Sequence, residues 1–133
     1  MALEFRPGFR FSLFDALILG LGAFGAIIEW PKTWWLGFVI AFVVGHFFLF
    51  CNVFRISRPP EMLWGMVFVL LTASTIFVGR PTWTETAFFS MAVTVAVIGM
   101  EMKKPSYHGV GWKFLNPNLQ EWWEASVRAS RGD

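Results

Sequence analysis

One histidine, His46, lies near the middle of a long run of apolar residues that carries no charge, from Thr33 to Phe54. Polar groups inside lipid are costly and are candidates for function for that reason. An imidazole nitrogen can ligate the metal of a haem or of a chlorophyll-type pigment. The phenylalanines around His46 would suit such a large planar ring; they are Phe42, Phe47, Phe48 and Phe50.

A structural role for His46 is the favoured interpretation, with a hydrogen bond to a hydroxyl or a backbone carbonyl of a neighbouring helix. The apolar segments contain no second histidine, so a haem with two axial histidines would need its other ligand from another subunit. Pigment or haem binding at a shared interface is therefore kept as an alternative, and proton or substrate handling as a further one.

A dense group of polar residues lies where the second apolar segment ends and the third begins. Asn52 and Arg55 are three positions apart and share a helix face. Arg55 or Arg58 could pair with Glu61 or with Asp15. We interpret this group, Asp15, Asn52, Arg55, Arg58 and Glu61, as a structural polar corner that ties three helices together, in preference to a lipid headgroup or partner contact.

Catalytic patterns are absent from the sequence. It contains no nucleophile with a base and an orienting group, no His/Cys cluster with metal-ligand spacing and no nucleotide-binding loop. Asp15 and Glu29 would be about 21 Å apart along a helix, too far for a carboxylate pair. Lysine and arginine do not cluster as they do in proteins that bind nucleic acid. We therefore expect neither an enzyme nor a nucleic-acid partner.

Composition identifies the solvent of the chain. Of the 133 residues, 56% are hydrophobic, 19% are aromatic and 15% are charged. Soluble domains carry about 25% charged residues. A domain of this size has too much surface for its volume to hide so many apolar side chains from water. The composition therefore predicts an integral membrane protein surrounded by a lipid bilayer.

Four apolar segments predict an all-α polytopic membrane protein, a four-transmembrane-helix bundle. About 20 residues of helix cross a hydrocarbon core, and proline-containing links separate the segments at 30–33, 58–61 and 79–82. Because these links are short, consecutive helices should be antiparallel neighbours. The predicted spans are about 11–30, 33–55, 61–79 and 84–101, within a transmembrane domain of residues 1–102.

The distribution of charge predicts the orientation. With four spans, all but two of the 11 lysines and arginines lie on the side of the termini; the exceptions are Lys32 and Arg80. Positive loops stay in the cytoplasm, so we expect both termini to be cytoplasmic, with the bacterial inner membrane as the location. An aromatic belt would mark the opposite interface, formed by Trp30, Trp34, Trp35 and Trp83.

Small and weakly polar residues predict where helices pack. Gly22 and Ala26 form a small-xxx-small pair, and Gly45 would admit a close neighbour. Hydroxyls recur every four residues along the last span, at Thr86, Ser90 and Thr94, and could face Thr72 and Thr75 on the third.

The tail, residues 103–133, begins with a loop that would leave His108 exposed. Asn116 and Pro117 are typical of a helix start, and they predict a short amphipathic cytoplasmic helix over about 117–129. Such a helix could lie on the membrane or dock onto another protein, unless it packs on its own bundle. The residues assigned to a partner or interface are Trp112, Leu119, Trp122 and Trp123.

These features predict a small, non-catalytic accessory or assembly subunit of a larger membrane protein complex. Its partners would be other membrane subunits or copies of itself, because the aromatic content exceeds what four self-contained helices need. One alternative is a pigment- or haem-associated subunit of a photosynthetic or respiratory complex that uses His46. Another is a small oligomeric transporter with Asp15, His46 and Asn52 on its path.

Overall fold

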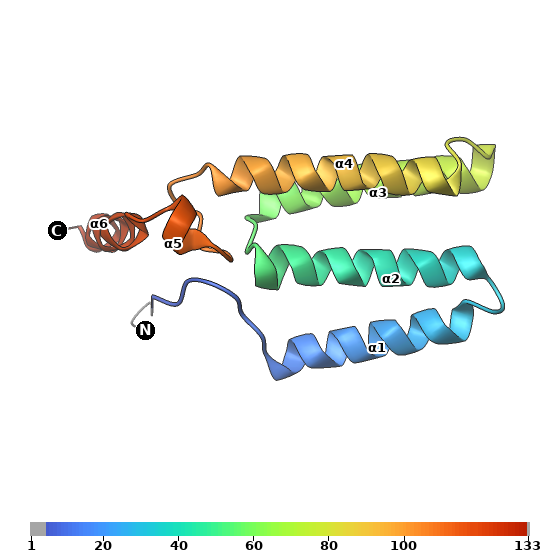
Figure 1. The fold of residues 1–133 in the computed structure, drawn as a ribbon, viewed down its shortest axis with the longest axis horizontal. Coiled ribbons are helices and arrows are strands. Elements are labelled where there is room, and N and C mark those ends of the chain that lie inside the picture. Colours follow the sequence, from blue (N-terminus) through green and yellow to red (C-terminus); the bar gives the residue numbers. More distant parts are fainter. Residues whose placement is uncertain (1–4, 133) are drawn as a thin grey trace.

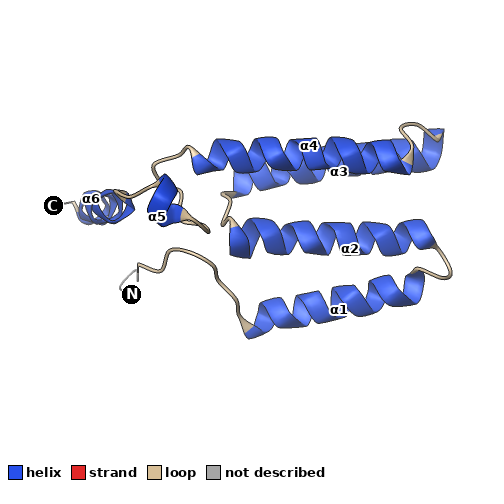
Figure 2. Cartoon of the chain, viewed as in Figure 1, coloured by secondary structure: helices blue, strands red, loops and turns tan. Residues whose placement is uncertain are grey.

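The chain folds into helices joined by short links, and the computed structural model describes residues 5–132 (Figure 1). Within that range the chain forms helices and loops and contains no strand (Figure 2). The elements in chain order are α1 (Leu13–Glu29), α2 (Trp34–Phe48), the π-helical turn η1 (Leu49–Val53), α3 (Arg58–Val78), α4 (Trp83–Met102), α5 (Trp112–Leu115) and α6 (Leu119–Arg131).

Three of the helices are long and apolar enough to cross a membrane. They are α2 with η1, Trp34–Val53, of 20 residues, then α3, of 21 residues, and α4, of 20 residues. Helix α1 is apolar too but has 17 residues. The structure thus supports an all-helical membrane protein with three candidate spans in its described part.

Local sequence signals determine where the helices begin and end. The Ser12 and Thr82 side chains form capping boxes with Asp15 and Glu85, at the starts of α1 and α4. Gly79 ends α3 in the left-handed conformation, with φ 77°. Helix α3 begins at 58 rather than 61, because prolines are tolerated in the first turn of a helix, whose N–H groups have no partner within the helix.

Helices α1 and α2 form one hairpin, packed through small residues. A side chain on Gly22 would collide with Val44, and one on Gly37 would collide with the Ala26 carbonyl oxygen. The backbones can approach only because these side chains are absent. Gly45 has a different environment from the one its sequence predicts, since no atom of another helix lies within 4 Å of where its Cβ would stand.

Helices α3 and α4 form a second hairpin, and its seam is the predicted stripe of hydroxyls. Thr86, Ser90 and Thr94 are buried in this seam. The Thr75 and Thr86 hydroxyl oxygens are 2.7 Å apart, one donating to the other. Thr72 is on the same helix as Thr75, but its buried hydroxyl has no hydrogen-bond partner in the described part of the chain.

The two hairpins meet at both ends of the spans. Near the chain termini, Phe50 of η1 packs with Trp64 and Phe68 of α3 and Val97 of α4 in the hydrophobic core. At the opposite end, Trp83 lies against Trp34 and stacks on Trp35, with centroids 5.7 and 5.8 Å apart. The predicted tryptophan group thus includes a ring cluster that joins the hairpins.

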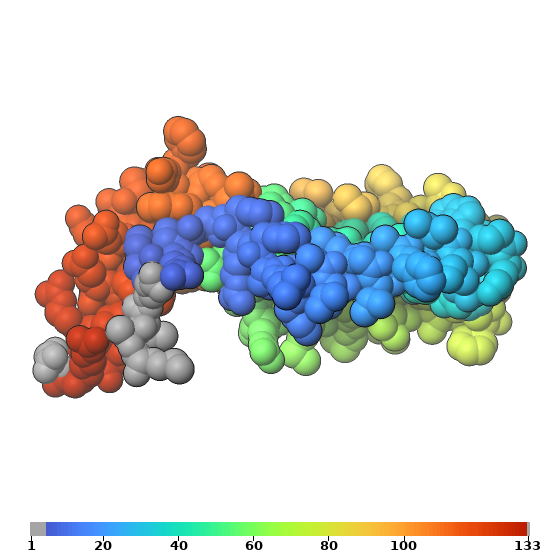
Figure 3. Space-filling model, turned by 90° about the horizontal axis from the view of Figure 1, so that it is seen from below, coloured from blue at the N-terminus to red at the C-terminus, as the bar shows by residue number. Residues whose placement is uncertain are grey.

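Helix α1 lies at one edge of the helical group, beside α2, and α3 and α4 overlap in this view on the other side of α2 (Figure 1). Viewed from the α1 side, the N-terminal segment lies against the tail beyond the ends of the long helices (Figure 3).

The tail helix is α6, which begins at Leu119, two residues after the predicted start. Asn116 and Pro117 instead belong to a preceding turn, in which the Leu119 N–H donates to the Asn116 carbonyl at 3.2 Å.

Candidate functional site

His46 is buried among aromatic rings contributed by α2, η1 and α3. Its imidazole stacks on Trp64, with centroids 4.5 Å apart and planes inclined by 15°, and lies 4.3 Å from the Phe42 ring. Its Nδ1 is 2.8 Å from the Phe42 carbonyl oxygen, one turn earlier on the same helix. The hydrogen bond therefore reaches a backbone carbonyl, as predicted, but one of its own helix rather than of a neighbour.

The Nδ1 contact determines the tautomer of His46. A carbonyl oxygen only accepts, so Nδ1 carries the proton and Nε2 is an acceptor in the neutral ring. Nε2 is buried and has no hydrogen-bond partner among residues 5–132. A ring held in this way has the tautomer of a metal-bound histidine. The space does not fit a macrocycle, because an axial ligand must present Nε2 in the plane of its ring and this atom is buried within the protein.

Asn52 holds the N-terminal segment onto η1. Its side-chain Nδ2 donates to the Arg10 carbonyl at 2.8 Å, and its own carbonyl accepts from the Arg10 N–H at 3.1 Å. Asn52 is buried, and Asp15 is an electrostatic neighbour of its side chain. Asn52 and Asp15 thus come together near the chain termini, whereas His46 lies apart from them among aromatic rings.

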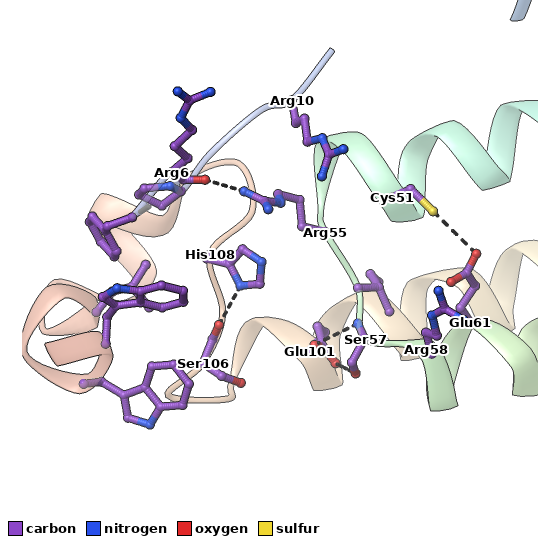
Figure 4. Close-up of a pocket in the computed structure, with 16 residues that line it drawn as sticks. Arg6, Arg10, Cys51, Arg55, Ser57, Arg58, Glu61, Glu101, Ser106 and His108 are labelled. Atoms are coloured by element: carbon purple, nitrogen blue, oxygen red, sulfur yellow. Dashed lines mark hydrogen bonds between the residues drawn. The ribbon is translucent and has the colours of Figure 1, made fainter. Parts of the chain in front are cut away.

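Arg55 occupies an unusual backbone conformation just after η1. Its φ is +48°, in the left-handed region that non-glycine residues seldom adopt. Its guanidinium donates to the Arg6 carbonyl (Figure 4). Partial burial, and secondarily the positive charge of Arg10, lower the pKa of Arg55 from its ordinary value. The fold therefore holds like charges close together.

The carboxylates of the same region are bound to other groups. The Cys51 thiol donates to Glu61 Oε1 at 3.5 Å. Glu101 accepts from the N–H and the hydroxyl of Ser57, both at 3.2 Å, and pairs with Lys104 at 2.8 Å. Glu101 is buried. It joins the C-terminal end of α4 to the start of α3.

The arginines expected in ion pairs do not form them. In the described part of the chain, no ion pair within 4 Å joins Arg55 or Arg58 to Asp15 or Glu61. The five residues of the predicted polar corner lie in one region, but its hydrogen bonds run through Asn52, Cys51 and backbone carbonyls. Sequence spacing could not show these bonds, because the carbonyls that accept from Asn52 and Arg55 belong to Arg10 and Arg6, in the irregular segment before α1.

A cavity of about 590 Å³ opens beside this region, between the ends of the long helices and the tail (Figure 4). Arg10, Arg55 and Arg58 line it, and Ile56 and Trp122 contribute apolar wall. A second cavity of about 570 Å³ shares Arg10 and Arg55 with it. His46 and Asp15 line neither. We call the first one the basic cavity; its other lining residues are Phe5, Arg6, Pro7, Cys51, Ser57, Glu61, Glu101, Ser106, His108, Leu119 and Trp123.

The tail loop is bound tightly to η1 and to the N-terminal segment. The Val110 N–H donates to the Val53 carbonyl at 2.8 Å, and a side chain on Gly109 would overlap the Phe54 carbonyl. His108, expected in an exposed loop, is half-buried; its Nδ1 donates to the Ser106 carbonyl at 2.8 Å, and its own carbonyl accepts from the Gly8 N–H at 2.6 Å.

Much of the predicted partner surface of the tail is used within the chain. Leu119 is only 1% exposed, so its side chain is not available to a partner. The Phe5 ring contacts Trp112 and Trp123, at centroid distances of 6.1 and 5.8 Å. Trp122 is 39% exposed and remains accessible. Three of the four residues assigned to a partner, Trp112, Leu119 and Trp123, therefore pack within the chain itself, which was the alternative to docking.

The basic cavity was missed by sequence reasoning because its walls come from segments far apart in the chain. Among residues 5–132, no three His, Cys, Asp or Glu side chains are grouped so that they could hold a metal ion. The arrangement can bind and position an anion.

Comparison of the chain with known protein families, with characterised proteins and with solved structures finds no match.

Proposed function

We propose that this protein is a non-catalytic accessory or assembly subunit of a larger membrane protein complex. The observation that carries the proposal is an apolar stripe among the exposed residues of α1, which also include Leu13 and Ile27. Its residues alternate at spacings of three and four, the pattern with which one helix packs along another. All of them are exposed: Phe14, Leu17, Leu21, Phe24 and Ile28.

Helix α1 packs on α2 through small residues. Gly22 and Ala26 face the hairpin seam, whereas Leu21 and Phe24 are 71% and 64% exposed. Lipid alone would cover these side chains and requires no regular spacing. A partner helix would bury them in register, and we propose that such a helix, from another membrane subunit, lies along the stripe.

The proposal includes four spans with both termini in the cytoplasm of a bacterial cell. Helix α1, about 26 Å long, is slightly shorter than the ~30 Å core, which a bilayer accommodates at modest cost. The excess of lysine and arginine on the side of the termini supports the orientation. On that side, α6 presents Glu124 and Arg128, an exposed pair 3.9 Å apart, as the polar face of an amphipathic helix.

Reporter fusions test this topology. Fusions after Lys32 and after Arg80 are expected to be active with a periplasmic reporter, and a fusion after Arg58 with a cytoplasmic one. A cytoplasmic reporter active after Lys32 would mean that α1 does not cross the membrane.

Extraction of the protein from its native membrane in a mild detergent, followed by native mass spectrometry, tests the assignment as a subunit. The expected result is a complex of fixed stoichiometry that contains other membrane proteins. A mass equal to one or two copies of the chain would contradict the proposal.

A pigment- or haem-associated subunit remains a second candidate because of one observation at His46. Its Nδ1 is committed to the Phe42 carbonyl and its Nε2 is an unpartnered acceptor. Because Nε2 is buried, binding would require side chains around it to move, so the geometry supports this candidate less well. An absorption spectrum of the purified complex decides: a Soret or near-infrared band that His46→Ala removes would establish it, and no such band in the wild type would eliminate it.

A further inference from the structure

The basic cavity holds more positive charge than its own carboxylates balance. Arg10, Arg55 and Arg58 line it, and none of these side chains forms an ion pair within 4 Å among the described residues. Of the two acids in the lining, Glu101 is already neutralised by Lys104 at 2.8 Å. Glu61 accepts from Cys51 instead. An anion in the cavity would offset the remaining charge.

The fold holds two of these arginines in place by independent means. Asn52 bonds both the N–H and the carbonyl of Arg10. Arg55 has a left-handed backbone and donates to the Arg6 carbonyl. The pKa of Arg55 is lowered by partial burial and by the charge of Arg10, so the two cations repel each other without an ion between them. Guanidinium groups match the geometry of phosphate oxygens better than any other side chain.

Apolar side chains form another part of the lining, and the cavity lies where the long helices end. Ile56, Leu119 and Trp122 form wall beside the arginines. A small inorganic anion would leave this apolar wall in contact with water. A phosphate that carries hydrocarbon would satisfy both halves of the cavity, and basic pockets at the ends of spans are where anionic headgroups bind.

We propose that the basic cavity binds the phosphate of an anionic phospholipid, with the phosphate on Arg10, Arg55 and Arg58 and the glycerol and first acyl carbons against Ile56 and Trp122. Inorganic phosphate shares the charged half of this chemistry, and the two sources differ only in the contact with the apolar wall. The inference does not depend on the assignment as an accessory subunit.

Titration of the full-length protein in a neutral detergent tests the proposal, with native mass spectrometry as the readout. The probes are phosphatidylglycerol, phosphatidylcholine and inorganic phosphate. We expect phosphatidylglycerol to bind at least about tenfold more tightly than phosphatidylcholine, because only its phosphate has no cation of its own. Equal binding of the two lipids would overturn the proposal. Competition by inorganic phosphate at the same concentrations would assign the cavity to the free ion and would overturn the lipid part.

The variant Arg10→Gln/Arg55→Gln is expected to lose the preference for phosphatidylglycerol. Arg80→Gln/Arg131→Gln is the matched control, because it removes two charges outside the cavity lining and should retain the preference. The variant Arg10→Lys/Arg55→Lys keeps the charge and should retain part of the preference even if the glutamine variant does not fold. Loss of the preference in the control, or full retention in a folded glutamine variant, would contradict the assignment.

Discussion

The Trp64 indole on α3 stacks on the His46 imidazole on α2, with ring centroids 4.5 Å apart. The same indole donates through Nε1 to the Thr94 hydroxyl of α4 at 2.8 Å. One side chain of α3 thus contacts both α2 and α4. The ring stack joins α2 to α3 and the hydrogen bond joins α3 to α4, so this side chain links the two hairpins.

Trp64→Phe removes the donor and keeps most of the ring. We expect a loss of about 1–3 kcal/mol in the free energy of unfolding, because the Thr94 hydroxyl and the Ser90 carbonyl lose a buried partner. Unfolding in mixed detergent micelles, followed by circular dichroism, measures it. Trp122→Phe is the control and should change stability by less than ~0.5 kcal/mol; equal losses in both variants would refute the role of Trp64.

Two glycines of α2 should respond in opposite directions to the same substitution. Gly37→Ala places a methyl group against the Ala26 carbonyl and is expected to cost about 1–3 kcal/mol by overpacking the hairpin. Gly45→Ala meets no atom within 4 Å, so it should stabilise the helix by about 0.5–1 kcal/mol. The same unfolding measurement compares them, and a neutral Gly37→Ala would show that α1 is not packed closely on α2.

The hydroxyl seam between α3 and α4 predicts the effect of size at Thr86. This residue is 0% exposed, and its hydroxyl is 2.7 Å from that of Thr75. Thr86→Leu is expected to cost about 1–3 kcal/mol, because the seam has no room for the longer side chain. Thr84→Leu, on the exposed side of the same turn, should be tolerated. If both substitutions were tolerated in the unfolding assay, the two helices could not pack along this seam.

Tyr107 is the only tyrosine of the chain, so the absorbance of its phenolate reports the ionisation of this one residue. Burial, and secondarily the Glu101 carboxylate, raise the pKa of its phenol above the ordinary value of 10.0. The unfolded chain therefore loses this proton at a lower pH than the folded one. The contribution to stability is present below pH 10 and declines as the pH rises above it.

Absorbance of the phenolate during an alkaline titration reports this pKa directly. We expect a midpoint above that of the same protein unfolded in detergent, and no transition of this kind in Tyr107→Phe. Coincident midpoints in the folded and unfolded protein would show that the loop around Tyr107 is not packed on η1.

Sequence reasoning predicted the helical class and the packing seams, because both depend on local patterns. Continuous apolar runs, proline breaks and the four-residue spacing of Thr86, Ser90 and Thr94 need no knowledge of the tertiary fold. The π-helical turn at 49–53, the left-handed Arg55 and the docking of Gly109 on Phe54 could not be predicted in this way. They arise from contacts between segments about 50 residues apart, for which no local pattern exists.

In the candidate site, too, local features could be predicted from the sequence, whereas contacts between distant segments could not. The sequence indicated that Asn52, Arg55, Arg58 and Glu61 form a polar group, because they are near one another along the chain. It also suggested ion pairs, which the structure replaces with bonds from Asn52 and Arg55 to the carbonyls of Arg10 and Arg6. The N-terminal segment that supplies those carbonyls is itself bonded to the tail, through the Gly8 N–H and the His108 carbonyl, so the basic cavity becomes visible only in the folded chain.

A photo-crosslinking amino acid at Leu21, in the middle of the exposed stripe on α1, tests the central proposal most directly when it is activated in native membranes. The account predicts one discrete adduct with another membrane protein. The same amino acid at Val69, an exposed position on α3, should give no such adduct. Crosslinks from Leu21 only to lipid, or only to a second copy of the chain, would contradict the account of this protein as an accessory subunit.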